Sequence, residues 1–221
     1  MIPTLRNLSR LALGLAAVPF LAQAAMANLV TNGDFESTGG FSSSYALVAN
    51  NNQANCHPPG VYTVGNNPNN CHESWASYGP HSGENQLIVN GAQNASLAVY
   101  ISDSVTVVPT GLYHLSIFGA SSYGTSPANL DIQINGVSLG QFQLSSTAGT
   151  WTEFAVDWTA VTSGAVISIY DLDTDFDGND FTLDDISLTA VRVPTQPAPE
   201  PATLALLGAG LAGLGFRRRR R

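Results

Sequence analysis

The sequence predicts an all-β protein whose core is an antiparallel β-sandwich of about ten short strands. Apolar residues alternate with polar ones in short runs, as expected for strands with one buried face, and no helical periodicity is present between the two chain ends. Turn residues separate these runs, as at Pro109-Thr110-Gly111 and Asn135-Gly136. Strands without intervening helices favour a sandwich, most simply a jelly roll.

The expected strands follow one another from residue 29 to residue 191. The clearest alternation is in 130–134, where Leu130, Ile132 and Ile134 share one face, and in 153–158. Residues 50–70, rich in Asn, Pro and Gly, are expected to form a long loop. The full set of expected strands is 29–31, 45–48, 86–89, 97–101, 105–108, 112–118, 130–134, 153–158, 166–172 and 181–191.

The N-terminal end predicts a secretory signal peptide over residues 1–27. Arg6 and Arg10 form a basic region, residues 11–21 an apolar helix, and Ala25-Met26-Ala27 a small-residue cleavage site, with an earlier site possible at 22–24. Such a segment directs export through the Sec translocon. The folded domain is therefore expected to span residues 28–192.

The C-terminal end carries a second processing signal over residues 199–221. A proline-rich stalk at 193–198 leads to Pro199-Glu200-Pro201, an apolar run at 202–216 and five arginines at 217–221. At a rise of about 1.5 Å per residue, the run is a short transmembrane helix. The arginines hold its end in the cytoplasm.

This tail resembles the PEP-CTERM sorting signal of Gram-negative bacteria, in which Pro199, Glu200 and Pro201 match the signature triplet. The resemblance implies exosortase as a partner during export and transient anchoring in the inner membrane. It also implies cleavage of the tail and a final location at the cell surface or in the extracellular matrix.

The predicted domain is strongly acidic. Between residues 28 and 191 there are fifteen Asp and Glu residues and no Lys or Arg, and the net charge of the whole chain is −8 at pH 7. Such a surface excludes nucleic acid as a partner, because phosphate backbones are repelled. Neutral sugars and divalent cations remain as ligands, and solubility of an exported protein is the alternative explanation.

Cys56 and Cys71 are the only cysteines, and both fall in the exported domain. An even number in an oxidising compartment predicts a disulfide. Each cysteine precedes a histidine, so a Cys/His metal site is the alternative, although the close Cys spacing of zinc sites is missing.

Two short motifs at the ends of the domain give a second resemblance. Asn32-Gly33-Asp34-Phe35-Glu36 near the start and residues 183–188 in the last strand are similar to the galactose-binding-like jelly rolls of carbohydrate-binding modules. Tyr113 and Trp151 fit the same pattern. The resemblance implies a structural calcium ion held by Glu36 and by Asp184 or Asp185, with Asp34 nearby. We expect Asp184 to share its strand face with Ile186 and Leu188 and to point toward the core.

A second calcium prediction comes from the acidic turn before the last strand. Asp173, Asp175 and Asp177 precede Gly178 with the alternating spacing of an EF-hand loop, and Asp184 falls at position twelve. The flanking strands exclude a true EF-hand, and a solvated acidic turn is the alternative. The two calcium predictions compete for Asp184.

Sugar binding requires exposed aromatic rings beside polar groups. Catalytic residues are not predicted, because no nucleophile elbow is present and Glu153 and Asp157 lie about 13 Å apart along one strand. His114 is expected to be structural. The aromatic candidates in loops are Tyr62, Trp75, Tyr78 and Tyr123, and the densest polar and aromatic cluster is 75–83.

The sequence therefore favours a non-enzymatic surface or matrix protein with a calcium-stabilised jelly roll, acting in adhesion or in exopolysaccharide-associated biofilm. The alternatives are a carbohydrate-binding module for a neutral glycan and an extracellular polysaccharide hydrolase.

Overall fold

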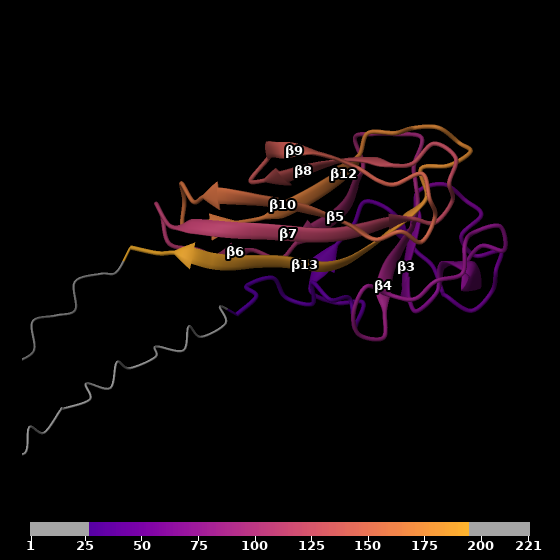
Figure 1. The fold of residues 1–221 in the computed structure, drawn as a ribbon, viewed down its shortest axis with the longest axis horizontal. Helices are drawn as coiled ribbons and strands as arrows, with labels where there is room; N and C mark the ends of the chain where they lie inside the picture. Colours follow the sequence, from indigo (N-terminus) through magenta and orange to yellow (C-terminus); the bar gives the residue numbers. More distant parts are fainter. Residues whose placement is uncertain (1–26, 195–221) are drawn as a thin grey trace, which may run out of the picture.

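The computed structural model describes residues 27–194, which form two packed sheets and a short two-stranded ribbon (Figure 1). One sheet has the order β1-β5-β12-β8-β9, the other the order β10-β7-β13-β4-β3-β2, and β11 pairs with β6. All pairs are antiparallel except β2 with β3. The predicted all-β sandwich is confirmed.

The elements are β1 (Phe41–Ser42), β2 (Ala46–Leu47), β3 (Val61–Gly65), η1 (Pro68–Asn70), β4 (Gln86–Asn90), β5 (Ala98–Ser102), β6 (Val105–Thr106), β7 (Leu112–Ser121), β8 (Asn129–Ile134), β9 (Val137–Gln143), β10 (Thr152–Thr159), β11 (Gly164–Ala165), β12 (Ile167–Asp171) and β13 (Phe181–Arg192).

The core lies between the two sheets. Leu115 and Ile117 of β7 face it from one side, and Ile132 of β8 and Ile167 of β12 face it from the other, all fully buried. Each such side chain contributes roughly 1.5–3 kcal/mol by leaving water. The predicted alternation in β8 is confirmed, because Leu130, Ile132 and Ile134 are all in this core.

Two expectations about the early part of the chain are wrong. Residues 29–31 are not a strand. Leu29 N donates to Leu188 O, but the Asn28 side chain accepts from Val30 N and Leu188 N. These side-chain hydrogen bonds take the place of the backbone hydrogen bonds that a paired strand would make. Residues 50–70 are not one long loop, because they contain β3 and η1. Val61 in β3 is buried on the side of the sheet that faces away from the main core. The Asn, Pro and Gly residues that surround this short strand gave the segment the composition of a loop.

The predicted disulfide between Cys56 and Cys71 is confirmed, with 5.2 Å between the two Cα atoms. Both cysteines are fully buried in a small second core with Val61, Trp75 and Ile88. Closing a loop of this length contributes about 3 kcal/mol in the chain-entropy model. The bond therefore fastens an irregular segment to the six-stranded sheet.

The last strand contains a β-bulge that changes which face its side chains occupy. The register of β13 with β7 shifts between Asp184 and Ser187, and Asp185 has a φ of 49°. Leu183 and Ile186 both lie in the core although they are three residues apart. The expectation that Asp184 shares a face with Ile186 and Leu188 is therefore wrong, because the extra residue breaks the alternation.

The bulge is also where the two terminal motifs meet. Ile186 N donates to Gly33 O at 2.8 Å, and a Cβ added to Gly33 would lie 2.0 Å from Ile186 O. Phe35, two residues on, is fully buried in the core. Glycine is required at this position because the two backbones are in contact. This contact is a physical reason why the motif at 32–36 and the motif at 183–188 occur in the same domain.

The predicted sorting triplet and apolar tail helix, and the predicted signal peptide except Ala27, fall in residues 1–26 and 195–221, outside the described part of the chain. Within residues 27–194, no helix has the length and apolar character needed to cross a membrane. β13 ends at Arg192, next to the predicted end of the domain.

Replacing Gly33 by alanine should lower the free energy of unfolding by about 1–3 kcal/mol, because the new methyl group meets a backbone carbonyl that cannot move freely. Gly79→Ala is the matched control, since nothing lies within 4 Å of its added Cβ. Denaturant unfolding of both variants measures the difference. Equal stability of the two variants would contradict the close approach of Gly33 to β13.

Candidate functional site

A pocket of about 170 Å³ lies at one end of the sandwich, among three irregular segments. These are the disulfide-bonded segment before and after β3, the connection between β7 and β8, and the connection between β12 and β13. In Figure 1 these segments gather at the end of the sandwich away from Arg192, the last residue of β13. The residues that line the pocket are His57, Pro59, His72, Ser74, Trp75, Asn90, Tyr123, Phe176, Asp177, Gly178 and Asp180.

Backbone contacts hold two of the three segments together. Asn179 N donates to Ser126 O at 2.7 Å, and a Cβ on Gly178 would lie 1.9 Å from Thr125 O. Gly178 has a φ of 121°, which other residues rarely adopt. The segment that carries Phe176 is therefore fixed against the segment that carries Tyr123.

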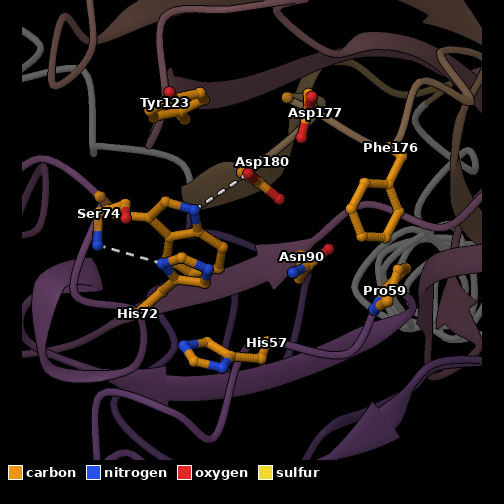
Figure 2. A pocket seen from close by; sticks show the side chains of 11 residues that line it. His57, Pro59, His72, Ser74, Asn90, Tyr123, Phe176, Asp177 and Asp180 are labelled. Atoms are coloured by element: carbon orange, nitrogen blue, oxygen red, sulfur yellow. Dashed lines mark hydrogen bonds between the residues drawn. The ribbon is translucent and has the colours of Figure 1, made fainter.

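The disulfide-bonded segment forms the third wall. The ring of His72 stacks on that of Trp75 with centroids 4.9 Å apart, and Trp75 Nε1 donates to Asp180 Oδ2 at 3.0 Å. Asn90 Nδ2 donates to Cys56 O at 2.6 Å and ties this wall to β4. Figure 2 shows the Trp75–Asp180 hydrogen bond in the middle of the pocket.

Two aromatic side chains are exposed at the mouth of the pocket. Tyr123 is 39% exposed and Phe176 is 64% exposed, and they lie on either side of Asp180 in Figure 2. Tyr123 was predicted as a ligand-binding residue, whereas Phe176 was not. Phe176 lies between Asp175 and Asp177, and the spacing of these aspartates predicted a calcium site instead. An aromatic residue at the tip of an acidic turn is nevertheless a signal of a binding site.

The other predicted aromatic candidates are buried or engaged. Tyr62 packs in the main core, and Trp75 is 3% exposed although its edge reaches the pocket. The hydroxyl of Tyr78 contacts Ser121 O, and its Oη lies 3.0 Å from Thr182 Oγ1. Burial raises the pKa of Tyr78 to about 12. Of the four, Tyr123 alone presents its ring to solvent at the pocket.

The predicted cluster at 75–83 is divided: Trp75 lines the pocket, Ser82 lines a separate depression, and Tyr78 and His81 pack over the six-stranded sheet. The His81 ring stacks on Phe118 with centroids 3.7 Å apart, and its Nδ1 lies 2.6 Å from Asp185 Oδ2. Trp151 meets Tyr78 edge-to-face. These contacts cover the bulge of β13.

The first predicted calcium set does not fit an ion, because protein donors occupy its carboxylates. Glu36 Oε1 accepts from the backbone N–H groups of Glu84 and Asn85, and these bonds lower its pKa. Asp184 is fully buried and accepts from the N–H groups of His81, Ser82 and Asp185. Asp185 also accepts from Ser82 Oγ. Asp34 is exposed and lies with Asp185 in a separate depression of the surface.

The residues of the second predicted calcium set do not all lie together. Ser126 Oγ donates to both Asp173 Oδ2 and Asp175 Oδ2, at 2.8 Å each, so these two carboxylates are neighbours. Asp177 lies in the pocket, and Asp184 is held by His81 and Ser82.

Asp171, which the sequence did not single out, lies beside this set. Its Oδ1 accepts from Asp173 N, while its buried Oδ2 has no hydrogen-bond partner within residues 27–194. Asp171, Asp173 and Asp175 carry the oxygen ligands that hard cations prefer, but the ligand atoms of the three carboxylates do not all lie within 4.8 Å of one another.

Three buried aspartates have pKa values above the ordinary value. Burial raises the pKa of Asp171 to about 8, of Asp180 to about 7 and of Asp184 to about 6. In Asp180 the hydrogen bond from Trp75 offsets part of the effect. Burial therefore favours the protonated form of Asp171 in the folded protein.

His114 pairs with a carboxylate of the neighbouring strand: its Nδ1 lies 2.7 Å from Asp157 Oδ1 of β10. Glu153, on the same face, accepts from Ser116 Oγ. Both pairs lie on the strands of the six-stranded sheet and do not line the pocket.

Comparison with known proteins supports the resemblance of the tail. Residues 197–220 match the PEP-CTERM protein-sorting motif, so the predicted sorting tail is confirmed. No curated protein matches the chain. The motif indicates an exported protein whose C-terminal anchor is cleaved.

The solved structures that are similar to the domain have low sequence identity to it. The Stig cyclase Fisc from Fischerella sp. TAU is 16% identical with a TM-score of 0.53, over 77% of this chain and 100% of that one. The CBM22-1 xylan-binding domain of Paenibacillus barcinonensis Xyn10C is 15% identical with a TM-score of 0.45, over 73% and 93%. A family 35 carbohydrate-binding module from an environmental isolate is 15% identical with a TM-score of 0.41, over 74% and 96%.

The raised pKa values predict that stability falls as pH rises. Unfolded aspartate ionises near its ordinary pKa of about 3.9, so between that pH and about 8 the folded state binds more protons. Thermal denaturation in EDTA should give a lower midpoint at about pH 8.5 than at about pH 6.5. Asp171→Asn should flatten this dependence, and exposed Asp103→Asn should not. A midpoint that rises across this interval would contradict the burial of an uncompensated Asp171.

Proposed function

We propose that this chain is an exosortase-processed, non-catalytic protein of the cell surface or extracellular matrix, whose β-sandwich binds a neutral glycan. Binding would serve adhesion or an exopolysaccharide-associated biofilm. The pocket at the loop end of the sandwich is the proposed binding site. Its position away from Arg192 supports the proposal, because the binding end then faces away from the side on which the chain continues to the sorting motif.

The observation that carries the proposal is the pair of exposed rings, Tyr123 and Phe176, above a polar floor. Aromatic faces stack on the apolar faces of sugar rings, and polar neighbours fix the orientation of hydroxyl groups. His57, Ser74 and Asp177 are exposed polar residues of the pocket. These are the elements that a sugar site needs.

The charge of the domain restricts the class of glycan. No Lys or Arg lies between residues 28 and 191, so carboxylated or sulfated sugars find no cation and meet Asp177 instead. A neutral hexose or pentose polymer suits this surface.

A hydrolase is the second candidate, and Asp180 is the reason to test it. Its raised pKa of about 7 beside Asp177 is the kind of pairing that acid and base catalysis uses. Asp180, however, is a buried residue, 7% exposed, and its Oδ2 accepts a hydrogen bond from Trp75 Nε1. We therefore assign it a structural role, and release of reducing ends from any bound polymer would contradict that assignment.

A glycan array should show selective binding of a neutral oligosaccharide by the protein. Tyr123→Ala and Phe176→Ala should each weaken that binding by about tenfold, since a lost aromatic contact costs on the order of 1 kcal/mol. Val161→Ala is the control, because Val161 is 80% exposed and outside the pocket. Binding of no sugar, or equal binding by all variants, would contradict the proposal.

We further propose that calcium stabilises the turn at Asp171, Asp173 and Asp175. Calcium should then raise the melting temperature by several degrees relative to EDTA, because an ion that binds the folded state stabilises it. Asp171→Asn should lose this rise, and Asp34→Asn, which belongs to the first predicted set, should keep it. Loss of the rise in Asp34→Asn, or no rise in the unaltered protein, would contradict the assignment.

A further inference from the structure

The disulfide brings together three side chains that can bind a metal ion. His57 and His72 each follow a cysteine of the bond, and Glu73 comes next in the chain. Within residues 27–194 they form the one set of three or more His, Cys, Asp or Glu side chains whose ligand atoms all lie within 4.8 Å of one another. We propose that His57, His72 and Glu73 bind a divalent transition-metal ion, with zinc as the test ion.

The geometry supports a shared ion. His57 Nε2 lies 2.7 Å from Glu73 Oε2, and His72 Nδ1 lies 3.9 Å from the same oxygen. The centroids of the two imidazole rings are 4.7 Å apart. Ligand atoms at these separations need only small side-chain rotations to converge on one ion at the usual zinc distances of about 2.0–2.2 Å.

The backbone around the three residues is already ordered. Cys56 N donates to Cys71 O at 3.0 Å beside the disulfide, and Cys71 N donates to Pro68 O at the end of η1. The disulfide therefore already holds the two segments that carry the ligands close together, so an ion does not have to supply the free energy of ordering them. The sequence presented a disulfide and a Cys/His metal site as alternatives. The disulfide is formed, so the proposed site uses the two neighbouring histidines and Glu73 and not the cysteines.

One of the proposed ligand atoms already accepts a hydrogen bond from the backbone. Ser74 N donates to His72 Nδ1 at 3.2 Å, and an ion at this nitrogen would replace that long bond.

The ligand set selects a class of ion. Two imidazoles and one carboxylate suit zinc, copper and nickel, whereas calcium takes oxygen ligands. Three protein ligands leave one tetrahedral position for water. His57 and Glu73 are about half exposed, so an ion can reach them from solvent.

Without an ion, the same residues would form an exposed ion pair, which contributes little to stability. His114 and Asp157 provide the matched comparison. They form a similar exposed pair at 2.7 Å, but no second histidine completes a set around them.

Calorimetric titration of the full chain with Zn²⁺, with the disulfide intact, tests the proposal. We expect one ion per chain, and His57→Gln, His72→Gln and Glu73→Gln should each weaken binding by about tenfold or more, since even outer-shell partners of metal ligands contribute 10–100-fold. His114→Gln should bind zinc as the unaltered protein does, and excess calcium should not compete. Circular dichroism checks that each variant keeps its β-structure.

Zinc affinity that is the same in the unaltered protein and in all three variants would overturn the proposal and leave an ion pair alone. An equal loss in His114→Gln would overturn it as well, because binding would then follow histidine number. Copper(II) spectra add an independent readout: electron paramagnetic resonance should show nitrogen couplings that His57→Gln and His72→Gln each reduce. The proposal does not depend on glycan binding, so the two can fail separately.

Discussion

The Cys56–Cys71 disulfide is the constraint on which the functional end of the molecule depends. It lies fully buried over Val61 and Ile88, on the side of the six-stranded sheet that faces away from the main core. A segment of polar residues and prolines has too little apolar surface to fold against the sheet by itself. With the bond formed, Trp75 reaches across to Asp180, and the segment becomes a wall of the pocket.

The bulge of β13 and the pocket differ in how their polar groups are used. At the bulge, Ile186 N donates to Gly33 O, and the carboxylates of Asp184 and Glu36 accept from backbone N–H groups of residues 81–85. At the pocket, Phe176 and Tyr123 remain exposed. In the turn before Phe176, Asp171 has a buried oxygen without a hydrogen-bond partner among residues 27–194.

Local patterns in the sequence were sufficient for the fold class, most strands, the disulfide and the sorting tail. Contacts between distant segments were not predictable in the same way. The alternation rule placed Asp184 on the wrong face because one bulged residue at Asp185 reverses it. The spacing of the aspartates in residues 173–177, together with Asp184, predicted one ion site. In the structure, Asp177 lines the pocket, whereas Asp184 accepts a hydrogen bond from His81 N. Phe176 was missed because its exposure depends on how Gly178 packs against Thr125.

The central claim is that the disulfide-bonded segment builds the sugar-binding pocket. It is tested most directly by titrating one protein sample with its selected neutral sugar before and after reduction of the disulfide, with the β-sheet circular dichroism followed throughout. The account predicts that reduction abolishes sugar binding while the main sandwich keeps its spectrum, because the large core between the two sheets contains neither cysteine. Unchanged affinity in the reduced protein would contradict it.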